Sequence, residues 1–555
     1  MKQLIILFVF CLPSIVQTHA QAPVVTMSSA KKTVTIHAEW TGDGSLVANN
    51  VVLKNGNSSR MHDVVTVNAD SSVVLIATGD VQLTLLWCVS NELTALDVTN
   101  CPELKELQCG SNSLTVLDVS KCKKLEMLHC DGHFLTALDV TNCTKLTYLS
   151  CNGNNVGSLS ALDVTSCQEL TTLSCWHNSL TALDVTKCRK LTKLDCSYNS
   201  LAVLDVTNCP ELTELMCNGN SLSTLEIANC KKLKQLRCSN NSFSTFDVSS
   251  IPQLEWLDCS INSLSILDVT NNPNLTRLSC SRNSLSVLDI SKCRKLTKLD
   301  CSYNSLTVLD VTHCPELESL DCTSNSLPVL DVNNNPNLTE LSCYSNTLTT
   351  LDIVNCRELT RLLCFDNRLS SLSITNCPKL TFLRCENNAL TALDVSNCSD
   401  LYNLECNNNS LTNLDVANCV KLRKLNFANN FLSTLDMTKC KMLSNLDCSN
   451  NLLTELDVMN CPELQYLDAD FQAPVLPTAV LDDARLSIEN PITFVGGEVS
   501  INRISHGGKY TAGDIIWKVS SESGEVTFNF VTKLPKGISG KPFSGTAMLP
   551  WTKNP

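Results

Sequence analysis

The sequence predicts a repeat solenoid, in which short strands stack into one parallel β-sheet array with non-helical segments opposite and a small β domain at each end. A 21-residue pattern, L-x-x-L-x-C-x-x-N-x-L-x-x-L-D-V-x-x-C-x-x, recurs about 18 times over residues 83–469. Each unit offers a strand too short to bury its apolar side alone, so the units are expected to stack. The flanking segments 21–82 and 470–555 contain no cysteine and differ in composition.

Within each unit, numbered from its first leucine, side-chain alternation sends positions 4 and 6 inward and positions 3 and 5 outward. Position 9 is asparagine in every full unit except the one that carries His133. An inward amide at a turn can bond backbone groups that the sheet leaves unpaired. Asn199, Asn304 and their equivalents are therefore predicted to form a structural ladder. One interval between units is 24 residues long, and its three extra residues fit at 157–159.

Two columns contain all the cysteines except Cys11, with 17 at position 6, including Cys196 and Cys301, and 15 at position 19. Phe427 interrupts the first column, and Ile251, Asn272 and Asn335 interrupt the second. The substitutes Phe and Ile indicate an apolar interior, where a free thiol behaves as a small hydrophobe. An in-register ladder holds Cβ atoms about 4.8 Å apart, whereas a disulfide needs about 3.8 Å. Buried, reduced thiols are therefore favoured over stacked disulfides. A column is not a tetrahedron, so no metal is expected.

The segments Leu191–Leu201 and Leu296–Leu306 fit the core L-x-x-L-x-L-x-x-N-x-L, with cysteine in place of the third leucine. The chain therefore resembles the leucine-rich-repeat family. The 21-residue length and the cysteine are similar to the cysteine-ladder repeats of internalin-like bacterial surface proteins. This resemblance covers about 83–469 and implies the leucine-rich-repeat fold. It implies a binding function only in general terms, since such repeats bind many kinds of ligand.

The N-terminus has the features of a secretory signal peptide over residues 1–20. Lys2 gives a positive start, Leu4–Leu12 is almost wholly apolar, and Ala20 is a small residue at the expected cleavage site. The apolar run is about half of the roughly 20 residues that a membrane span needs. We therefore expect a secreted or cell-surface protein with no transmembrane segment in the mature chain. The net charge of -13 argues against a nucleic-acid partner, which would require a basic face.

Both flanks are predicted to be β-rich. Residues 21–82 contain strand patterns at 32–37 and 72–76, and we interpret this segment as an N-terminal cap that shields the first repeat. Residues 470–555 begin with an apparent linker at Pro474 and Pro477 and continue with four short strand patterns. They are interpreted as a β-sandwich-like module, resembling modules that follow repeats in bacterial surface proteins.

No catalytic arrangement is apparent in the sequence. The C-terminal module has no cysteine after Cys461 and a single histidine, His506, whereas a cysteine enzyme needs an accessible, activated thiol. The chain is therefore predicted not to be an enzyme and to need no cofactor. The run His129-Cys-Asp-Gly-His133 resembles a metal motif. His133 takes the inward position 9 while His129 and Asp131 take outward positions, so a structural role is favoured.

Position 15 is acidic in nearly every unit, from Asp97 to Asp457. Basic residues at positions 18, 20 and 21, such as Lys190, are expected to pair with this column. Calcium binding along the column is the alternative, but a solvated, partly paired face is favoured.

The variable outward positions 3, 5, 7 and 8 carry whatever specificity exists. Aromatic residues are scarce there, and exposed clusters of aromatic and arginine side chains mark interaction sites. The alternative for each cluster is random apolar drift on a tolerant surface. The three candidate groups are Tyr148, Trp176, His177 and Tyr198; Trp256, Ile261, Arg277 and Arg282; and Tyr344, Arg361, Phe365, Phe382 and Arg384.

Together these observations predict an internalin-like adhesin whose exposed sheet face binds a protein on a host or neighbouring cell. The alternative is a carbohydrate-binding surface protein that uses the same aromatic rings as stacking platforms. An enzyme with its activity in the C-terminal module is the third and least supported reading.

Overall fold

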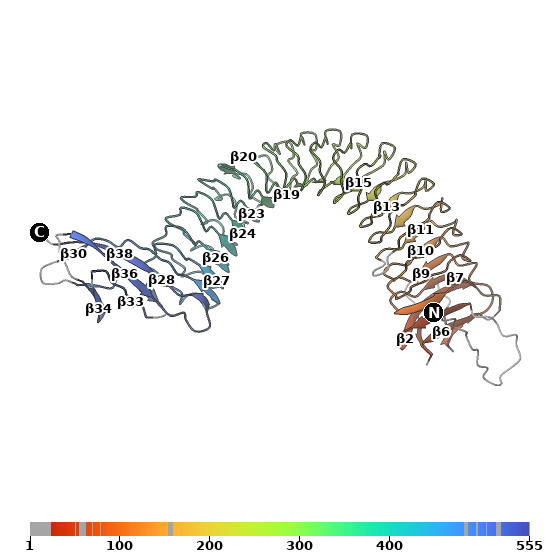
Figure 1. Cartoon of the computed structure of the whole chain (residues 1–555), viewed down its shortest axis with the longest axis horizontal. Helices are drawn as coiled ribbons and strands as arrows, with labels where there is room; N and C mark the ends of the chain where they lie inside the picture. Colours follow the sequence, from red (N-terminus) through yellow and green to blue (C-terminus); the bar gives the residue numbers. More distant parts are fainter. Residues whose placement is uncertain are drawn as a thin grey trace. The chain divides into compact units, whose positions relative to one another are not determined.

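The structure is a computed structural model that describes residues 24–49, 51–54, 63–68, 70–77, 79–153, 159–481, 487–495, 498–506, 508–517 and 523–553. The predicted signal peptide and the first two inserted residues, at 157 and 158, lie outside this range. The chain forms two compact units, Met1–Pro210 and Glu211–Pro555, which are described separately. All regular elements in the described residues are β-strands, so none of these elements is a helix that could cross a membrane (Figure 1).

The first unit begins with the predicted cap, and both strands expected there are present as β2 (Thr33–Thr41) and β6 (Ser72–Ala77). β2 pairs antiparallel with β7 (Gln82–Trp87), the strand of the first repeat. β1 (Val25–Ser29) pairs antiparallel with β8 (Leu93–Asp97), on the other side of the same repeat. The cap therefore covers backbone groups that the first repeat would otherwise expose. Its remaining strands are β3 (Leu46–Ala48), β4 (Val51–Val52) and β5 (Asp63–Thr66).

Each full repeat after the first contributes a three-residue strand at positions 3–5. Neighbouring strands are parallel and in register, as Leu128 pairs with Leu149. The central leucine faces the interior, and Leu128 and Leu299 expose 0% and 2% of their surface. The strands of the first unit are β9 (Glu106–Gln108), β10 (Met127–His129), β11 (Tyr148–Ser150), β12 (Thr172–Ser174) and β13 (Lys193–Asp195).

The second unit repeats this arrangement, and three strands also form at positions 13–15 on the opposite side. These three are β20 (Val329–Asp331), β22 (Thr350–Asp352) and β28 (Glu455–Asp457). The main sheet contains β14 (Glu214–Met216), β15 (Gln235–Arg237), β16 (Trp256–Asp258), β17 (Arg277–Ser279), β18 (Lys298–Asp300), β19 (Ser319–Asp321), β21 (Glu340–Ser342), β23 (Arg361–Leu363), β24 (Phe382–Arg384), β25 (Asn403–Glu405), β26 (Lys424–Asn426), β27 (Asn445–Asp447) and β29 (Tyr466–Asp468).

The cysteine columns lie in the core, as predicted. All 32 described cysteines are buried free thiols, including Cys196 and Cys301. The backbone at position 6 continues the hydrogen bonding between neighbouring repeats, since the amide of Cys301 donates to the carbonyl oxygen of Asp321 at 2.9 Å. At position 19, the thiol of Cys314 donates to the carbonyl oxygen of Cys293 at 3.5 Å. Burial raises the pKa of Cys301 well above its ordinary value.

The asparagine ladder is also confirmed. The Nδ2 of Asn304 donates to the carbonyl oxygens of Cys280 at 3.0 Å and Cys301 at 3.1 Å. Its Oδ1 accepts from the backbone amide of Leu285 at 2.9 Å. Asn199 makes the equivalent bonds in the first unit. Each amide therefore ties the backbone of its own repeat to that of the repeat before it.

The C-terminal module continues the solenoid directly, and the predicted linker at Pro474–Pro477 is wrong. β29 pairs parallel with β37 (Ser539–Lys541), and β28 pairs parallel with β32 (Thr493–Val495). The backbone amide of Leu476 donates to the carbonyl oxygen of Met548 at 2.8 Å. The segment after the last repeat is therefore bonded to the module along its length instead of spacing it away.

The rest of the module contains two sheets, in the orders β30-β38-β36-β33 and β31-β35-β34. The buried rings of Trp517 and Trp551 meet in this module, with centroids 6.3 Å apart. The strands are β30 (Ala479–Leu481), β31 (Ser487–Glu489), β33 (Ser500–Asn502), β34 (Lys509–Thr511), β35 (Asp514–Ile516), β36 (Ser523–Val531) and β38 (Ser544–Lys553).

Candidate functional site

The first predicted group lies on the sheet face of the first unit. Trp176 and His177 meet edge to face, with ring centroids 5.7 Å apart. Trp176 is 39% exposed, and Tyr198, one repeat further on, is 55% exposed. Tyr148 is the first residue of its strand, in register with Thr172, whereas Trp176 and His177 follow the end of theirs. Within the described residues, ring contacts join only Trp176 and His177 in this group.

In the second group, arginines from the two neighbouring strands flank Trp256. The Cζ atoms of Arg237 and Arg277 lie 3.7 and 5.0 Å from the ring centroid. At position 8, the Cζ of Arg282 lies 4.3 Å from the centroid of the Tyr303 ring. These are cation–π distances. Sequence reasoning missed Arg237 and Tyr303, although both occupy outward positions one repeat away from residues of the predicted group.

The structure brings all five residues of the third group into ring contacts. Tyr344 and Phe365 stack with centroids 4.1 Å apart and an angle of 10° between their planes. The Cζ of Arg384 lies 4.3 Å from the Phe365 centroid. The Cζ of Arg361 lies 4.2 Å from the Phe382 centroid. Each of the three rings therefore contacts a second ring or an arginine side chain on this part of the face.

Tyr303 of the second group and Tyr344 of the third group lie close enough to interact. Burial raises the pKa of Tyr344, and the neighbouring Tyr303 raises that pKa further. We call the resulting surface the aromatic strip. The aromatic strip consists of Arg237, Trp256, Arg277, Arg282, Tyr303, Tyr344, Arg361, Phe365, Phe382 and Arg384.

Acidic side chains hold one end of the aromatic strip in place. Arg384 pairs with Glu386 and, at 3.4 Å, with Glu405, which also pairs with Lys424 at 2.8 Å. Burial raises the pKa of Glu386, and the neighbouring Arg384 only partly offsets that effect. The guanidinium over Phe365 is therefore fixed from two directions, by a ring and by carboxylates.

The histidines of the possible metal motif are separated as expected. His133 is fully buried in the asparagine ladder, and neither of its ring nitrogens has a hydrogen-bond partner. On the face, the Nε2 of His129 lies 3.0 Å from Oδ2 of Asp131, so these two side chains do meet. In the part of the chain that the structure describes, no group of three or more His, Cys, Asp or Glu side chains could hold a metal.

On the opposite face, the acidic column caps turns. The Oδ1 of Asp310 accepts from the backbone amide of Thr312 at 2.9 Å, and hydrogen bonds from the Thr312 side chain and backbone lower the pKa of Asp310.

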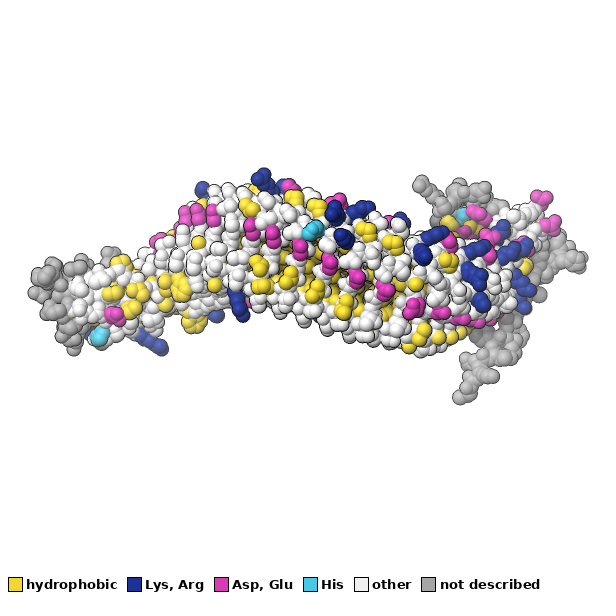
Figure 2. All heavy atoms as spheres, turned by 90° about the horizontal axis from the view of Figure 1, so that it is seen from above, with side chains coloured by type: hydrophobic (Ala, Val, Ile, Leu, Met, Phe, Trp, Pro, Cys, Tyr) yellow, Lys and Arg dark blue, Asp and Glu magenta, His cyan; other side chains and the backbone are white. Residues whose placement is uncertain are grey.

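The expected pairing of position-21 lysines with the acidic column is wrong for Lys190. This lysine pairs instead with Glu169, one repeat back, at 2.5 Å. Figure 2 shows acidic side chains in a row, with hydrophobic side chains beside them.

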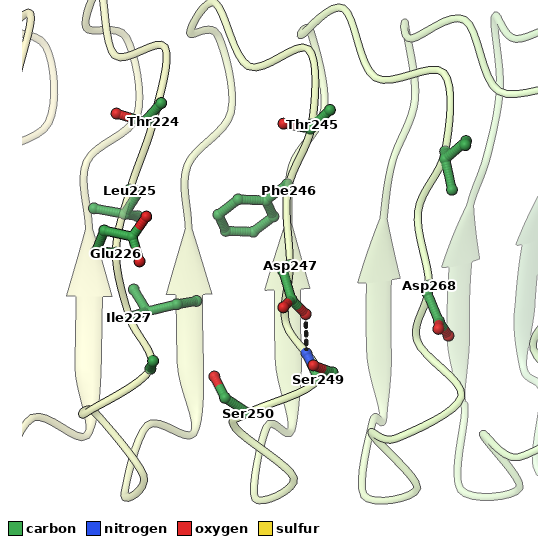
Figure 3. Close-up of a pocket in the computed structure, with 12 residues that line it drawn as sticks. Thr224, Leu225, Glu226, Ile227, Thr245, Phe246, Asp247, Ser249, Ser250 and Asp268 are labelled. Atoms are coloured by element: carbon green, nitrogen blue, oxygen red, sulfur yellow. Dashed lines mark hydrogen bonds between the residues drawn. The ribbon is translucent and has the colours of Figure 1, made fainter.

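An open groove lies on this opposite face where Phe246 replaces the usual leucine of position 14. Figure 3 shows the Phe246 ring between neighbouring repeats, with Glu226, Asp247 and Asp268 along the groove. The carboxylate of Asp247 already accepts from the backbone amide of Ser249 at 2.8 Å. Asp247 and Asp268 therefore present ordinary turn-capping carboxylates beside one apolar ring.

Comparison with solved structures agrees with this architecture. The functional domain of InlJ from Listeria monocytogenes, described as including a cysteine ladder, is 28% identical, with a TM-score of 0.51; the match covers 86% of this chain and 94% of that one. The LRR protein LIC12759 of Leptospira interrogans is 26% identical, with a TM-score of 0.52 and coverage of 63% and 91%. The LRR ectodomain of GASSHO1/SCHENGEN3 from Arabidopsis thaliana is 23% identical, with a TM-score of 0.58 and coverage of 69% and 53%, and shares the fold.

Residues 496–552 match a family model described as LRR adjacent. No curated protein matches the chain. The repeat pattern, the two buried thiol columns and these similarities agree with one another. The chain is a leucine-rich-repeat solenoid with a cysteine ladder, similar in fold and repeat pattern to the functional domain of InlJ.

Proposed function

We propose that this chain is a secreted or cell-surface adhesin that binds a protein on another cell through its exposed sheet face. The observation that carries this proposal is the aromatic strip. Aromatic and arginine side chains supply most of the binding energy at many protein interfaces. Here they are held on a regular sheet by one another, so little conformational freedom is lost when a partner binds.

The contacts of the rings favour a protein over a glycan. A sugar that stacks on an aromatic platform needs an uncovered ring face. Arg237 and Arg277 flank the ring of Trp256. Tyr344 and Arg384 both lie against the ring of Phe365. These rings therefore have less free face for a sugar, while their edges and the arginine N–H groups remain for a protein surface.

Similarity supports the same proposal. InlJ and LIC12759 come from bacteria and share the repeat architecture over most of their own length. The predicted signal peptide agrees with export of the chain. Sequencing the N-terminus of the mature protein tests export directly, and we expect it to begin at Gln21.

Binding is tested with the Tyr344→Ala/Phe365→Ala variant and fluorescently labelled protein on intact candidate host or bacterial cells. We expect attachment to fall about tenfold or more while the melting temperature is kept. The matched control is Val287→Ala/Val308→Ala, which removes apolar side chains that are 70% and 71% exposed on the opposite face. Protease treatment of the cells should abolish attachment and glycosidase treatment should not. Wild-type attachment by the face variant, or loss by the control alone, contradicts the proposal.

A further inference from the structure

Of the five arginines in the aromatic strip, only Arg384 has an acidic partner in the part of the chain that the structure describes; Arg361 lies over Phe382, and the other three lie around Trp256 and Tyr303. Within the described residues, no ion pair joins Arg237, Arg277 or Arg282 to a carboxylate, although each lies over an aromatic ring. The Nε of Arg237 is buried and makes no hydrogen bond. Arg384 differs, because it pairs with two glutamates. The guanidinium groups around Trp256 therefore keep unused hydrogen-bond donors.

Asp258, which lies in register with Arg237, and Asp300 on the same face already accept hydrogen bonds. The Oδ1 of Asp258 accepts from Oγ of Ser260 at 2.7 Å, and the Oδ1 of Asp300 accepts from Oγ of Ser302 at 2.6 Å. Both carboxylates also accept a bond from the backbone amide of the same serine, at 3.1 Å in each case. They are thus directed toward their own turns, which agrees with the absence of ion pairs to the three arginines.

The stacking also fixes how the arginines can be used. A guanidinium that lies over a ring uses its face for that contact and keeps its planar N–H edge, which matches a carboxylate in bidentate geometry.

The backbone at position 8 is left-handed in this part of the face. The φ angles of Ile261, Arg282 and Tyr303 are 52°, 53° and 52°. Such a conformation is costly for bulky and β-branched residues. Other repeats place Gly219 or Asn240 there, at lower cost.

We propose that Arg237, Arg277 and Arg282 form a subsite for the carboxylates of an acidic segment in the protein partner. This inference rests on the proposed function and names the chemistry that the partner must present. The net charge of -13 gives the chain no general attraction for polyanions. Binding of an acidic peptide therefore reports on a local cationic site.

The test uses the full mature chain and a fluorescently labelled peptide of ten glutamates, followed by anisotropy. We expect saturable binding that the Arg277→Gln/Arg282→Gln variant weakens at least tenfold and that added salt weakens. The matched control is Arg294→Gln/Lys295→Gln, which removes the same charge from exposed residues on a turn of the same repeat. Melting temperatures establish that each variant is folded.

The outcomes separate the subsite from the proposed function. Equal weakening by both variants, or no binding to the wild type, overturns the subsite. Arginine-dependent binding of heparin without binding of the glutamate peptide also overturns it, in favour of a sulfated glycan. If the peptide fails but Tyr344→Ala/Phe365→Ala still abolishes cell attachment, the proposed function stands alone. If the peptide binds through the arginines but no cell attachment depends on the face, the carboxylate subsite stands and the adhesin proposal fails.

Discussion

The side-chain amide nitrogen of Asn304 lies 3.0 Å from the carbonyl oxygen of Cys280, which belongs to the preceding repeat. The same nitrogen donates to Cys301 in its own repeat, and Oδ1 accepts from the amide of Leu285. One side chain thus satisfies backbone groups of two repeats at a turn. The regular spacing of the solenoid depends on this ladder as well as on the leucine core.

Replacing Asn304 with alanine should therefore destabilise the array. The substitution leaves backbone carbonyl and amide groups without partners, at a cost of roughly 2–4 kcal/mol. Thermal unfolding followed by circular dichroism should show a lower melting temperature. Ser305→Ala changes an exposed neighbour and should melt like the wild type. Equal melting of the Asn304 variant and the wild type would show that the ladder bonds are dispensable.

The cysteine columns should make the fold sensitive to alkaline pH. Burial raises the pKa of Cys293 to about 12 and that of Cys314 to about 11, from an ordinary value of 9.0. The folded state therefore keeps protons that the unfolded state releases above pH 9. The stabilising contribution of these thiols is present below pH 9 and is lost as pH rises toward 11–12.

Melting temperatures from pH 7 to 11 test this, with Cys293→Val/Cys314→Val as the comparison. The variant keeps the core apolar and should decline less steeply, since each thiol contributes up to about 1.4 kcal/mol per pH unit. Iodoacetamide should label few of the 32 buried cysteines in the native protein and nearly all after denaturation without reductant. Thiols that stay blocked until a reductant is added would identify disulfides instead.

His133 is a weak point of the ladder. It lies near the backbone of Asn112 and Cys109, yet neither ring nitrogen forms a hydrogen bond. Burial lowers the pKa of His133 below its ordinary value of 6.5. As pH falls, the unfolded state therefore binds a proton before the folded state does. The folding stability that depends on neutral His133 is present above pH 6.5 and is lost as pH falls below that value.

His133→Asn should restore the ladder bonds and raise stability by roughly 1–2 kcal/mol. The gain should grow as pH falls from 7 to 5, because the variant has no imidazole to protonate. His129→Asn is the control on the exposed face. Hydrogen bonding to Asp131 raises the pKa of His129. The stability that protonated His129 contributes is therefore lost as pH rises, which is opposite to the pH dependence expected for His133. A pH-independent gain in His133→Asn would contradict the argument.

The interior was predictable from the sequence because every repeat samples the same environment. Leu299 and Cys301 could be placed from the 21-residue period alone. The contact of Arg237 with Trp256 could not, since it depends on how two long side chains turn across neighbouring strands.

The end of the array was less well predicted. Counting to position 9 of the last, partial repeat would have identified Gln472, whose Nε2 donates to the carbonyl oxygen of Cys448 at 2.9 Å. Pro474 suggested a linker because proline cannot donate, but its carbonyl oxygen accepts from the amide of Met548 at 3.0 Å.

Docking of the C-terminal module should depend on Gly545. A Cβ at this residue would lie 1.9 Å from the carbonyl oxygen of Gln472, a distance that only a backbone shift can relieve. That shift would break the bonds from the Gln472 amide to Ser544 at 2.8 Å and from the Thr546 amide to Gln472 at 2.9 Å. Gly545→Ala should therefore destabilise the module by at least about 2 kcal/mol. Limited proteolysis should cleave it faster near residues 470–555, whereas Thr546→Ala, an exposed change in the same strand, should keep the wild-type rate. Unchanged proteolysis of the glycine variant would mean that the module does not dock against the last repeat through these bonds.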